Sequence, residues 1–276
     1  MKLAISNIAW DVTQDEHIAT LLGKHAIDAI DVAPGKYFPD ILNTKESDIK
    51  PVRAWWADQG IEITGMQSLL FGTTGLNLFG TAAVQKAMLD HLDAVCRIGA
   101  VLGATRLVFG SPRNRDRSAH NDADTIDIAA DFFSRLGAIA QHHDVVICLE
   151  PNPPCYGANF MTTSDETAHI VREVAHTAIK MQLDTGALAI NNENASVVLE
   201  KHADLIGHVH ASEPGLLPLG DAGVDHAAVH SSLVTHLAQH IVSIEMLATT
   251  TEPQRVAIER ALGVAIRHYR PTSLAP

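Results

Sequence analysis

The 276-residue chain has few cysteines, few basic residues and no long hydrophobic run near its start. Its three cysteines, Cys96, Cys148 and Cys155, show no CxxC spacing, so neither a disulfide framework nor a thiolate zinc site is expected. With 20 Lys and Arg against 32 Asp and Glu, the net charge of -12 disfavours nucleic acid and anionic membranes as partners. The opening MKLAISNIAWDVTQDEH is typical of neither a signal peptide nor a membrane span. We therefore expect a cytoplasmic protein.

Short apolar or β-branched runs alternate with longer amphipathic segments along the chain. Helices are expected at 80–104 and 125–143, where apolar residues recur every three or four positions, and a capping box of Thr163 and Glu166 precedes a further helix. Alternating strands and helices predict a parallel sheet, and eight repeats predict one single-domain (β/α)8 TIM barrel over residues 1–276. A doubly wound open sheet is the alternative. The expected strands lie at 3–9, 26–34, 61–67, 105–112, 145–151, 179–186, 205–213 and 241–247.

The last four predicted strands each end in a side chain that can bind a metal. In TIM barrels these ends converge on one mouth, where the chemistry takes place. Four such ends in succession favour a metal site over a set of unrelated solvated acids. The residues are Glu150, Asp184, His210 and Glu245.

The segment IGHVHASEP places two histidines, His208 and His210, on one face of a strand. His210 stands at the strand end beside the carboxylates and is the expected ligand. His208 is expected one layer deeper, as a core or supporting group.

Three carboxylates and one imidazole suit Mn²⁺, Mg²⁺ or Co²⁺ better than a structural zinc ion. A carbonyl and a neighbouring hydroxyl of a substrate could chelate such an ion, which would acidify the adjacent C–H and stabilise an enediolate. Glu150 and Glu245 come from strands separated by two others, so each could act as acid or base on one side of a planar intermediate.

At these residues the chain resembles the xylose isomerase-like TIM-barrel superfamily of sugar phosphate isomerases and epimerases. The superfamily includes ketose 3-epimerases, hydroxypyruvate isomerase, inosose dehydratase and endonuclease IV. The resemblance rests on Glu150, LDTG, GHVHASEP, SIEM and PLGDAGVDH. It implies that Glu150, Asp184, His210 and Glu245 hold one divalent ion, and that Glu150 and Glu245 shuttle protons. Mn²⁺ is the expected ion, with Mg²⁺, Co²⁺ and Zn²⁺ as alternatives, and a homodimer or homotetramer is the expected assembly.

The sequence departs from the ketose epimerases in the expected substrate contacts. Ala187 stands where they usually carry a histidine, GLLPLG lacks their arginine, and PNPPCYG lacks their additional glutamate. Other loops offer replacements, and the arginines favour a phosphate or carboxylate, with structural or solvated roles as the alternative. The candidates for substrate binding are Arg113, Arg115, Gln67, Lys36, Asn152, Glu213, Trp10 and His208.

Together these features predict a divalent-metal-dependent isomerase or epimerase acting on a sugar, sugar acid or sugar phosphate. A metal-dependent dehydratase (lyase) of a keto-sugar or keto-inositol is the alternative, because both reactions begin with the same proton abstraction. A DNA-repair endonuclease fits less well, since few histidines stand at strand ends and the charge repels phosphate backbones. A non-catalytic binding protein would not require the four ligands.

Overall fold

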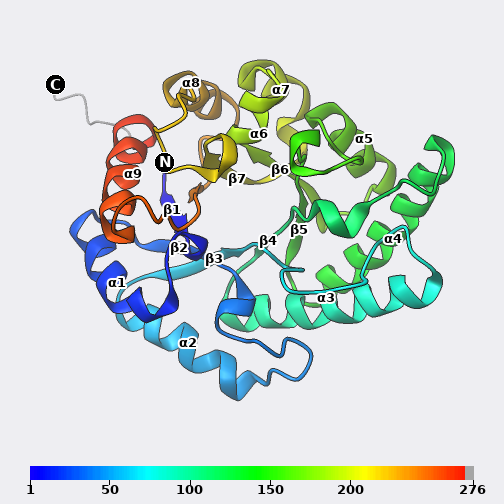
Figure 1. Cartoon of the computed structure of the whole chain (residues 1–276), viewed down its shortest axis with the longest axis horizontal. Coiled ribbons are helices and arrows are strands. Elements are labelled where there is room, and N and C mark those ends of the chain that lie inside the picture. The colour runs from blue at the N-terminus through cyan, green and yellow to red at the C-terminus, as the bar shows by residue number, and fades with distance from the viewer. Residues whose placement is uncertain (271–276) are drawn as a thin grey trace.

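The computed structural model describes residues 1–270, and eight parallel strands form a closed barrel in it (Figure 1). Consecutive strands are neighbours, and the barrel closes where β8 pairs with β1, for example Ile5 with Ile244. The predicted TIM barrel and all eight predicted strands are confirmed, and the open-sheet alternative is wrong. The strands are β1 (Leu3–Ser6), β2 (Ala29–Val32), β3 (Glu62–Met66), β4 (Arg106–Phe109), β5 (Val146–Leu149), β6 (Ile179–Asp184), β7 (Ile206–Ser212) and β8 (Val242–Glu245).

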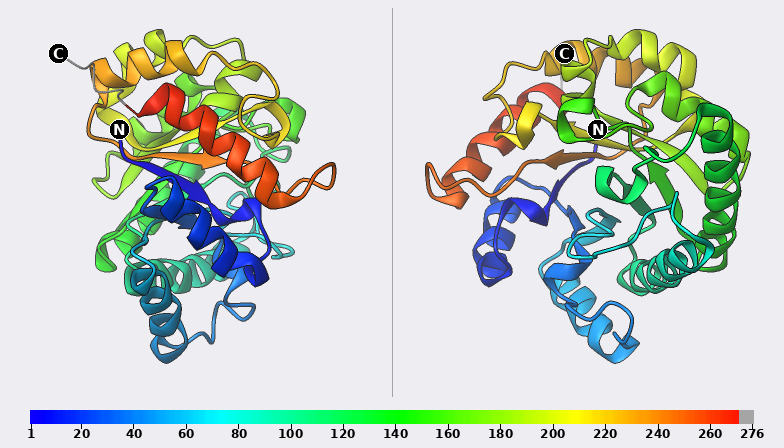
Figure 2. Two further views of the ribbon diagram at one scale, coloured as in Figure 1. Left: turned by 90° about the vertical axis from the view of Figure 1, so that its left-hand side faces the viewer. Right: turned by 45° about the vertical axis from the view of Figure 1, so that its right-hand side comes forward.

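Helices surround the barrel as an outer ring (Figure 1). The last helix, α9, contacts α1, which brings the two ends of the ring together (Figure 2). None of the helices within residues 1–270 is long and apolar enough to cross a membrane. The α-helices are α1 (Asp15–Lys24), α2 (Glu46–Asp58), α3 (Ala82–Leu102), α4 (Asp122–His142), α5 (Ser164–Val174), α6 (Thr185–Ile190), α7 (Ala195–His202), α8 (His226–His236) and α9 (Gln254–Tyr269).

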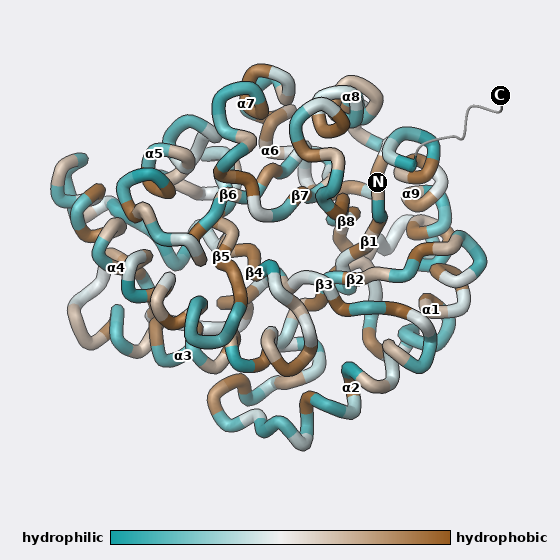
Figure 3. The backbone as a smooth tube through the Cα atoms, turned by 180° about the vertical axis from the view of Figure 1, so that it is seen from behind, coloured by the Kyte–Doolittle hydropathy of each residue, from teal (hydrophilic) through white to brown (hydrophobic). Residues whose placement is uncertain are grey.

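The apolar residues of the strands and of the inner helix faces form one core. β1, β2 and β8 are buried along their whole length, as expected for parallel strands that are covered on both faces. Between the barrel and α4, Phe109 and Phe133 pack edge to face with ring centroids 5.4 Å apart. Figure 3 shows hydrophobic segments on the strands and alternating hydropathy along the outer helices. This core holds the strand ends in fixed positions, so the side chains at the mouth are carried by a rigid frame.

Proline begins several of the short 3₁₀ turns that follow the strands. Pro34 opens η3 (Pro34–Lys36), Pro112 opens η4 (Pro112–Arg115), Pro154 opens η5 (Pro154–Tyr156) and Pro214 opens η7 (Pro214–Leu216). Proline suits the first position of a helical turn because its ring presets φ and its missing N–H needs no partner there. These turns fix the path of the chain at the mouth after β2, β4, β5 and β7. The other 3₁₀ turns are η1 (Asn7–Ala9), η2 (Val12–Gln14) and η6 (Ala203–Leu205).

The predicted capping box at the start of α5 is only half confirmed. The Thr163 hydroxyl accepts a hydrogen bond from the backbone N–H of Glu166 at 3.2 Å, as expected of an N-cap. The Glu166 carboxylate, however, accepts from the N–H and hydroxyl of Thr162, both at 2.8 Å, and not from the N-cap N–H. The reciprocal bond is therefore displaced by one residue, from the N-cap Thr163 to Thr162.

Thr163→Ala is expected to destabilise the protein by about 1 kcal/mol, because it removes the side-chain acceptor of the helix N-terminus. Thr162→Ala is the matched control, since its backbone N–H still bonds Glu166, and it should cost less. Urea unfolding of both variants, followed by circular dichroism, measures the difference. An equal or larger loss in Thr162→Ala would contradict this assignment of the cap.

Candidate active site

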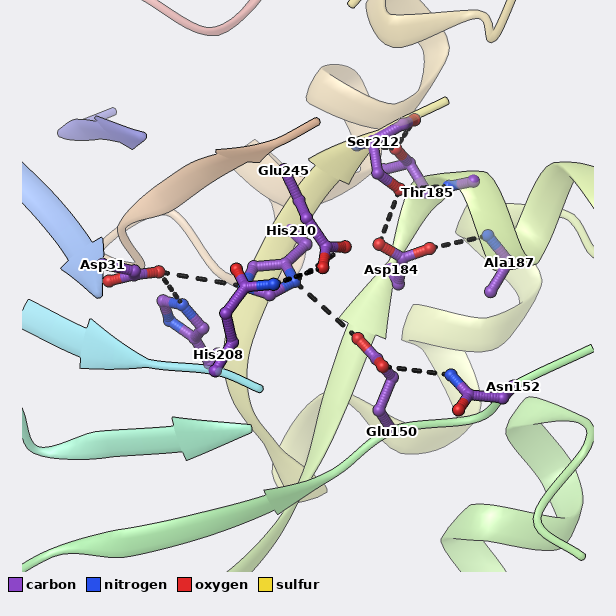
Figure 4. Close-up of polar contacts among 12 residues, drawn as sticks. Asp31, Glu150, Asn152, Asp184, Thr185, Ala187, His208, His210, Ser212 and Glu245 are labelled. Carbon is purple, nitrogen blue, oxygen red and sulfur yellow. Dashed lines mark hydrogen bonds and ion pairs between the residues drawn. The ribbon is translucent and has the colours of Figure 1, made fainter. Parts of the chain in front are cut away.

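Four side chains that can bind a metal converge at the carboxyl ends of β5 to β8 (Figure 4). Glu150 directly follows β5, Asp184 and Glu245 end β6 and β8, and His210 lies in β7. Each offers one ligand atom, and these atoms all lie within 4.8 Å of one another. All four residues are buried, with exposed fractions between 0% for His210 and 8% for Glu150 and Glu245. The barrel therefore brings together the four residues that the sequence places at strand ends.

Neighbouring side chains orient two of the carboxylates. Gln67, after β3, donates through Nε2 to Glu245 Oε1 at 2.5 Å, and Asn152 donates through Nδ2 to Glu150 Oε2 at 3.0 Å. The imidazole Nδ1 of His210 lies 3.2 Å from Glu245 Oε2 and 3.7 Å from Glu150 Oε1. Each glutamate is thus held by an amide through one oxygen and turns its other oxygen toward the histidine.

Asp184 is held by the start of α6 and by β7. Its Oδ1 accepts from the backbone N–H of Ala187 at 2.7 Å, which makes Asp184 the N-cap of α6. Its Oδ2 accepts from the Ser212 hydroxyl at 2.6 Å, and that hydroxyl in turn accepts from the N–H of Gly186 at 2.9 Å. Ala187 therefore holds Asp184 through its backbone N–H.

The electrostatics of the four residues fit a divalent cation. Burial, together with the charges of Glu245 and Glu150, raises the pKa of Asp184 to about 8. Burial opposes a charge on His210, but the neighbouring Glu245 carboxylate and the contacts with Asp31 and Glu150 raise its pKa well above the usual range. Within residues 1–270, Glu150 Oε1 is buried without a hydrogen-bond partner. A cation would offset the repulsion among the carboxylates and give this oxygen a partner.

A glycine makes room for one of the carboxylates. Gly110 follows β4, and a Cβ atom built there would lie 2.0 Å from Glu150 Oε2. Any side chain at this position would push the Glu150 carboxylate away from Asp184 and His210. The close approach explains why the chain carries glycine at the end of β4.

A second polar layer lies beneath the four residues. His208 is 3% exposed and its Nε2 lies 2.8 Å from Asp31 Oδ2, while His210 Nε2 lies 3.8 Å from the same oxygen (Figure 4). The two imidazole centroids are 5.2 Å apart, which confirms that both rings share one face of β7. The Asp31 carboxylate fits tightly, because a Cβ atom on Gly65 would lie 2.5 Å from its Oδ1. Asp31 thus lies against both histidines.

A cavity of about 640 Å³ opens above the four residues, and only some of the predicted substrate contacts reach it. Lys36, Gln67, Asn152 and Glu213 are among its lining residues. The structure places the other four candidates elsewhere, and these are Arg113, Arg115, Trp10 and His208.

Arg115 and Trp10 pack inside the protein and lie outside the cavity lining. Arg115 is fully buried, and its Nη1 donates to the backbone carbonyl of Glu150 at 2.8 Å, so it supports the loop after β5 from below. Trp10 is also fully buried, and its indole N–H donates to Asp15 at 2.7 Å while its ring meets the Trp56 ring edge to face. Arg113 is exposed on η4 outside the cavity lining. Neither arginine offers a cation to the cavity.

Glu213 borders the cavity, but its carboxylate is engaged by the loop that follows. It accepts from the backbone N–H groups of Gly220 at 2.7 Å and Val224 at 3.1 Å, and it lies 3.2 Å from His226 Nε2. These contacts hold the PLGDAGVDH segment against β7. The structure therefore gives Glu213 an organising position in this loop.

Sequence reasoning missed Asp31, Ser212 and Tyr156. Asp31 lies in the apolar run AIDAIDVAP, and an acid inside a predicted buried strand is the signal that could have marked it. Ser212 lies two residues after His210 and so shares its face of the strand. Tyr156 lines the cavity, and its hydroxyl accepts from the N–H of Gly215 at 2.7 Å, but only its place in a loop could have suggested it.

Several solved structures share this architecture. D-psicose 3-epimerase, solved in the presence of D-fructose, aligns with a TM-score of 0.81 at 18% identity, covering 98% of this chain and 100% of that chain. The 3-keto-D-glucoside 4-epimerase of E. coli aligns with a TM-score of 0.75 at 17% identity over 95% and 98% of the two chains. The IOLI protein with a binding zinc atom aligns with a TM-score of 0.74 at 17% identity over 98% of each.

Among curated protein sequences, none matches the chain. The sequence model of one family, described as xylose isomerase-like TIM barrel, matches residues 20–268. This match runs from α1 to α9 and includes every strand end that carries a candidate ligand. The protein therefore belongs to the xylose isomerase-like TIM-barrel family.

Proposed function

We propose that the protein is a divalent-metal-dependent isomerase or epimerase that acts on a sugar through an enediolate intermediate. The observation that carries the proposal is the buried cluster of Glu150, Asp184, His210 and Glu245 at the mouth of the barrel. The likeness of the whole fold to structures of sugar epimerases supports the same class of reaction.

The proposed cofactor is one Mn²⁺ ion held by these four residues. Their three carboxylates and one imidazole are the ligand types that this ion accepts. When bound, such an ion polarises a substrate carbonyl and stabilises negative charge on the enediolate oxygens.

Glu150 and Glu245 are the proposed acid and base groups. Each has one oxygen held by an amide, from Asn152 or Gln67, which leaves the other oxygen to accept or return a proton. One carboxylate would remove the proton from the carbon beside the carbonyl. If the other returns a proton to the opposite face of the same carbon, the product is an epimer. Return of a proton to the former carbonyl carbon, with transfer of the neighbouring hydroxyl proton to the former carbonyl oxygen, gives an isomer.

The cavity favours a neutral sugar over the phosphate or acid that the arginines suggested. Lys36 lines the cavity, but its ammonium group donates to the backbone carbonyl of Asn7 at 2.6 Å and to that of Trp10. Arg113 and Arg115 lie outside the cavity lining, so they cannot pair with a phosphate there. Lys36 would have to bind the phosphate dianion alone, through the one N–H that it does not already donate to a backbone carbonyl.

Incubating the Mn²⁺-loaded protein with candidate keto sugars in D₂O tests the proposal. We expect deuterium to enter at the carbon beside the carbonyl while the sugar keeps its other atoms, as mass spectrometry and NMR can show. Chelation should abolish the exchange and leave the circular dichroism spectrum unchanged, because the barrel has its own packed core. Loss of 18 mass units would instead identify the dehydratase alternative, and exchange that survives chelation would refute metal dependence.

The two histidines of β7 should respond differently to substitution. His210→Ala removes one of four proposed ligands and should lower Mn²⁺ affinity by at least about tenfold. His208→Ala leaves the buried Asp31 carboxylate without its 2.8 Å partner and should cost about 1 to 3 kcal/mol of stability, with a smaller effect on the metal. Calorimetric Mn²⁺ titrations and thermal melts of the metal-free variants separate these effects. The reverse pattern would place the metal one layer deeper than proposed.

Gly110→Ala should weaken metal binding without unfolding the protein. The new Cβ would meet the end of the flexible Glu150 side chain, which can move aside, so the metal affinity should fall by about tenfold while the melting temperature changes little. Gly35→Ala is the matched control, because Gly35 also lines the cavity and a Cβ there would have no atom within 4 Å. Equal Mn²⁺ affinity of the two variants in calorimetry would count against Glu150 as a ligand.

A further inference from the structure

The mouth of the barrel is divided into two unlike halves. All four proposed ligands come from β5 to β8, so a substrate anchored there can extend over the loops after β1 to β4 on the other side of the closed barrel. The cavity of about 640 Å³ lies within the range of roughly 300–1,000 Å³ that is usual for ligand sites. There is room beyond the ligands for a further part of the substrate.

The side chains on that other half are largely apolar. Ile8 follows β1, Val108 lies in β4, and Leu69, Leu70 and Phe71 follow β3, and all five line the cavity. Phe71 is 86% exposed, which leaves a whole aromatic ring at the rim without packing partners. An exposed apolar side chain at the edge of a cavity gains most from a ligand that covers it.

Two leucines extend this apolar lining over the ligand half. Leu216 follows β7 and Leu247 follows β8, and the backbone N–H of Leu247 donates to the carbonyl of Leu216 at 2.9 Å. The bond joins the two loops, and Leu247 remains 50% exposed. The apolar side chains thus come from loops on both sides of the mouth.

Two of the polar side chains that line the β1–β4 half, Lys36 and Ser111, have partners inside the protein. The Lys36 ammonium group donates to two backbone carbonyls, and the Ser111 hydroxyl lies 2.5 Å from Asn114 Oδ1. Gln67 uses its Nε2 on Glu245, while its Oε1 is buried and unpartnered within the described chain. Gln67 Oε1 and the remaining N–H of Lys36 can therefore each meet a substrate hydroxyl, but sugar hydroxyls beside Ile8 and Phe71 would face hydrocarbon.

We propose that the substrate carries, beyond its keto-alcohol, an uncharged apolar group such as an alkyl or aryl substituent, and that this group lies against Ile8, Phe71 and Leu247. The inference rests on the proposed function, since the keto-alcohol is taken to occupy the ligand half. Burying unpaired hydroxyls against these side chains would cost free energy, whereas burying an alkyl or aryl group there gains it.

A series of 1-hydroxyalkan-2-ones tests the inference, because every member has the same keto-alcohol and differs only in chain length. The probes are hydroxyacetone, 1-hydroxybutan-2-one and 1-hydroxyhexan-2-one, with dihydroxyacetone phosphate as the anionic comparison. Two measurements are made with the Mn²⁺-loaded full chain, namely kcat/KM for deuterium exchange in D₂O by NMR and the dissociation constant by calorimetry. Full burial of a methylene corresponds to about fourfold in affinity. We expect the hexanone to bind at least about tenfold more tightly than hydroxyacetone, and the phosphate to gain nothing.

Two rim variants locate the apolar contact. Phe71→Ala and Leu247→Ala should each reduce the ratio of hexanone to hydroxyacetone affinity, by about threefold or more. Leu42→Ala is the matched control, because Leu42 is 58% exposed and does not line the cavity, and it should leave the ratio unchanged.

The two measurements distinguish failure of this inference from failure of the proposed function. Exchange that does not improve with chain length, or that is fastest with dihydroxyacetone phosphate, overturns the apolar subsite and leaves the enzymatic proposal standing. Affinity that rises with chain length, without exchange in any of these probes or in the keto sugars, overturns the proposed chemistry and retains the apolar subsite. An unchanged affinity ratio in both rim variants also overturns the subsite as placed here.

Discussion

Three carboxylates held together in a buried cluster are the feature on which the rest of the mouth depends. Glu150, Asp184 and Glu245 are at most 8% exposed, so water screens their mutual repulsion poorly. Burial, together with the charges of Glu245 and Glu150, accordingly raises the pKa of Asp184 to about 8. Such an arrangement survives folding only because the core of the barrel determines where the strands end. The stability of the core is therefore what holds the acidic cluster together.

The surrounding residues restrict each carboxylate in a different way. Asn152 and Gln67 hold one oxygen of each glutamate, while Ser212 and the first turn of α6 hold both oxygens of Asp184. Gly110 contributes by having no side chain, since a Cβ atom there would overlap Glu150. These partners come from loops or strand ends on five different strands, so the geometry of the cluster exists only when the barrel is closed.

The parts of the structure that follow from chain periodicity could be predicted from the sequence, and the parts that depend on loop packing could not. Alternation of strands and helices predicts the barrel, and the strand-end rule brings Glu150, Asp184, His210 and Glu245 together. No comparable rule determines where the side chain of a loop residue points. Arg115 is expected at the cavity because it follows β4, yet it turns inward to the carbonyl of Glu150, 35 residues farther along the chain. That bond depends on how two neighbouring βα loops pack, which no local pattern encodes.

Asp31 illustrates a second reason why the site could not be fully predicted from the sequence. Its partners His208 and His210 lie on β7, and the contact between Asp31 and His208 spans 177 residues of sequence. The alternation of side chains along a strand shows that both histidines share one face of β7. It does not reveal that β2 presents an acid to them across the barrel interior. Once the barrel closes, Asp31 supports the layer beneath the four strand-end residues. Loops can change without moving the strand ends of a barrel, so the side chains that line the rest of the cavity are specified separately from Glu150, Asp184, His210 and Glu245.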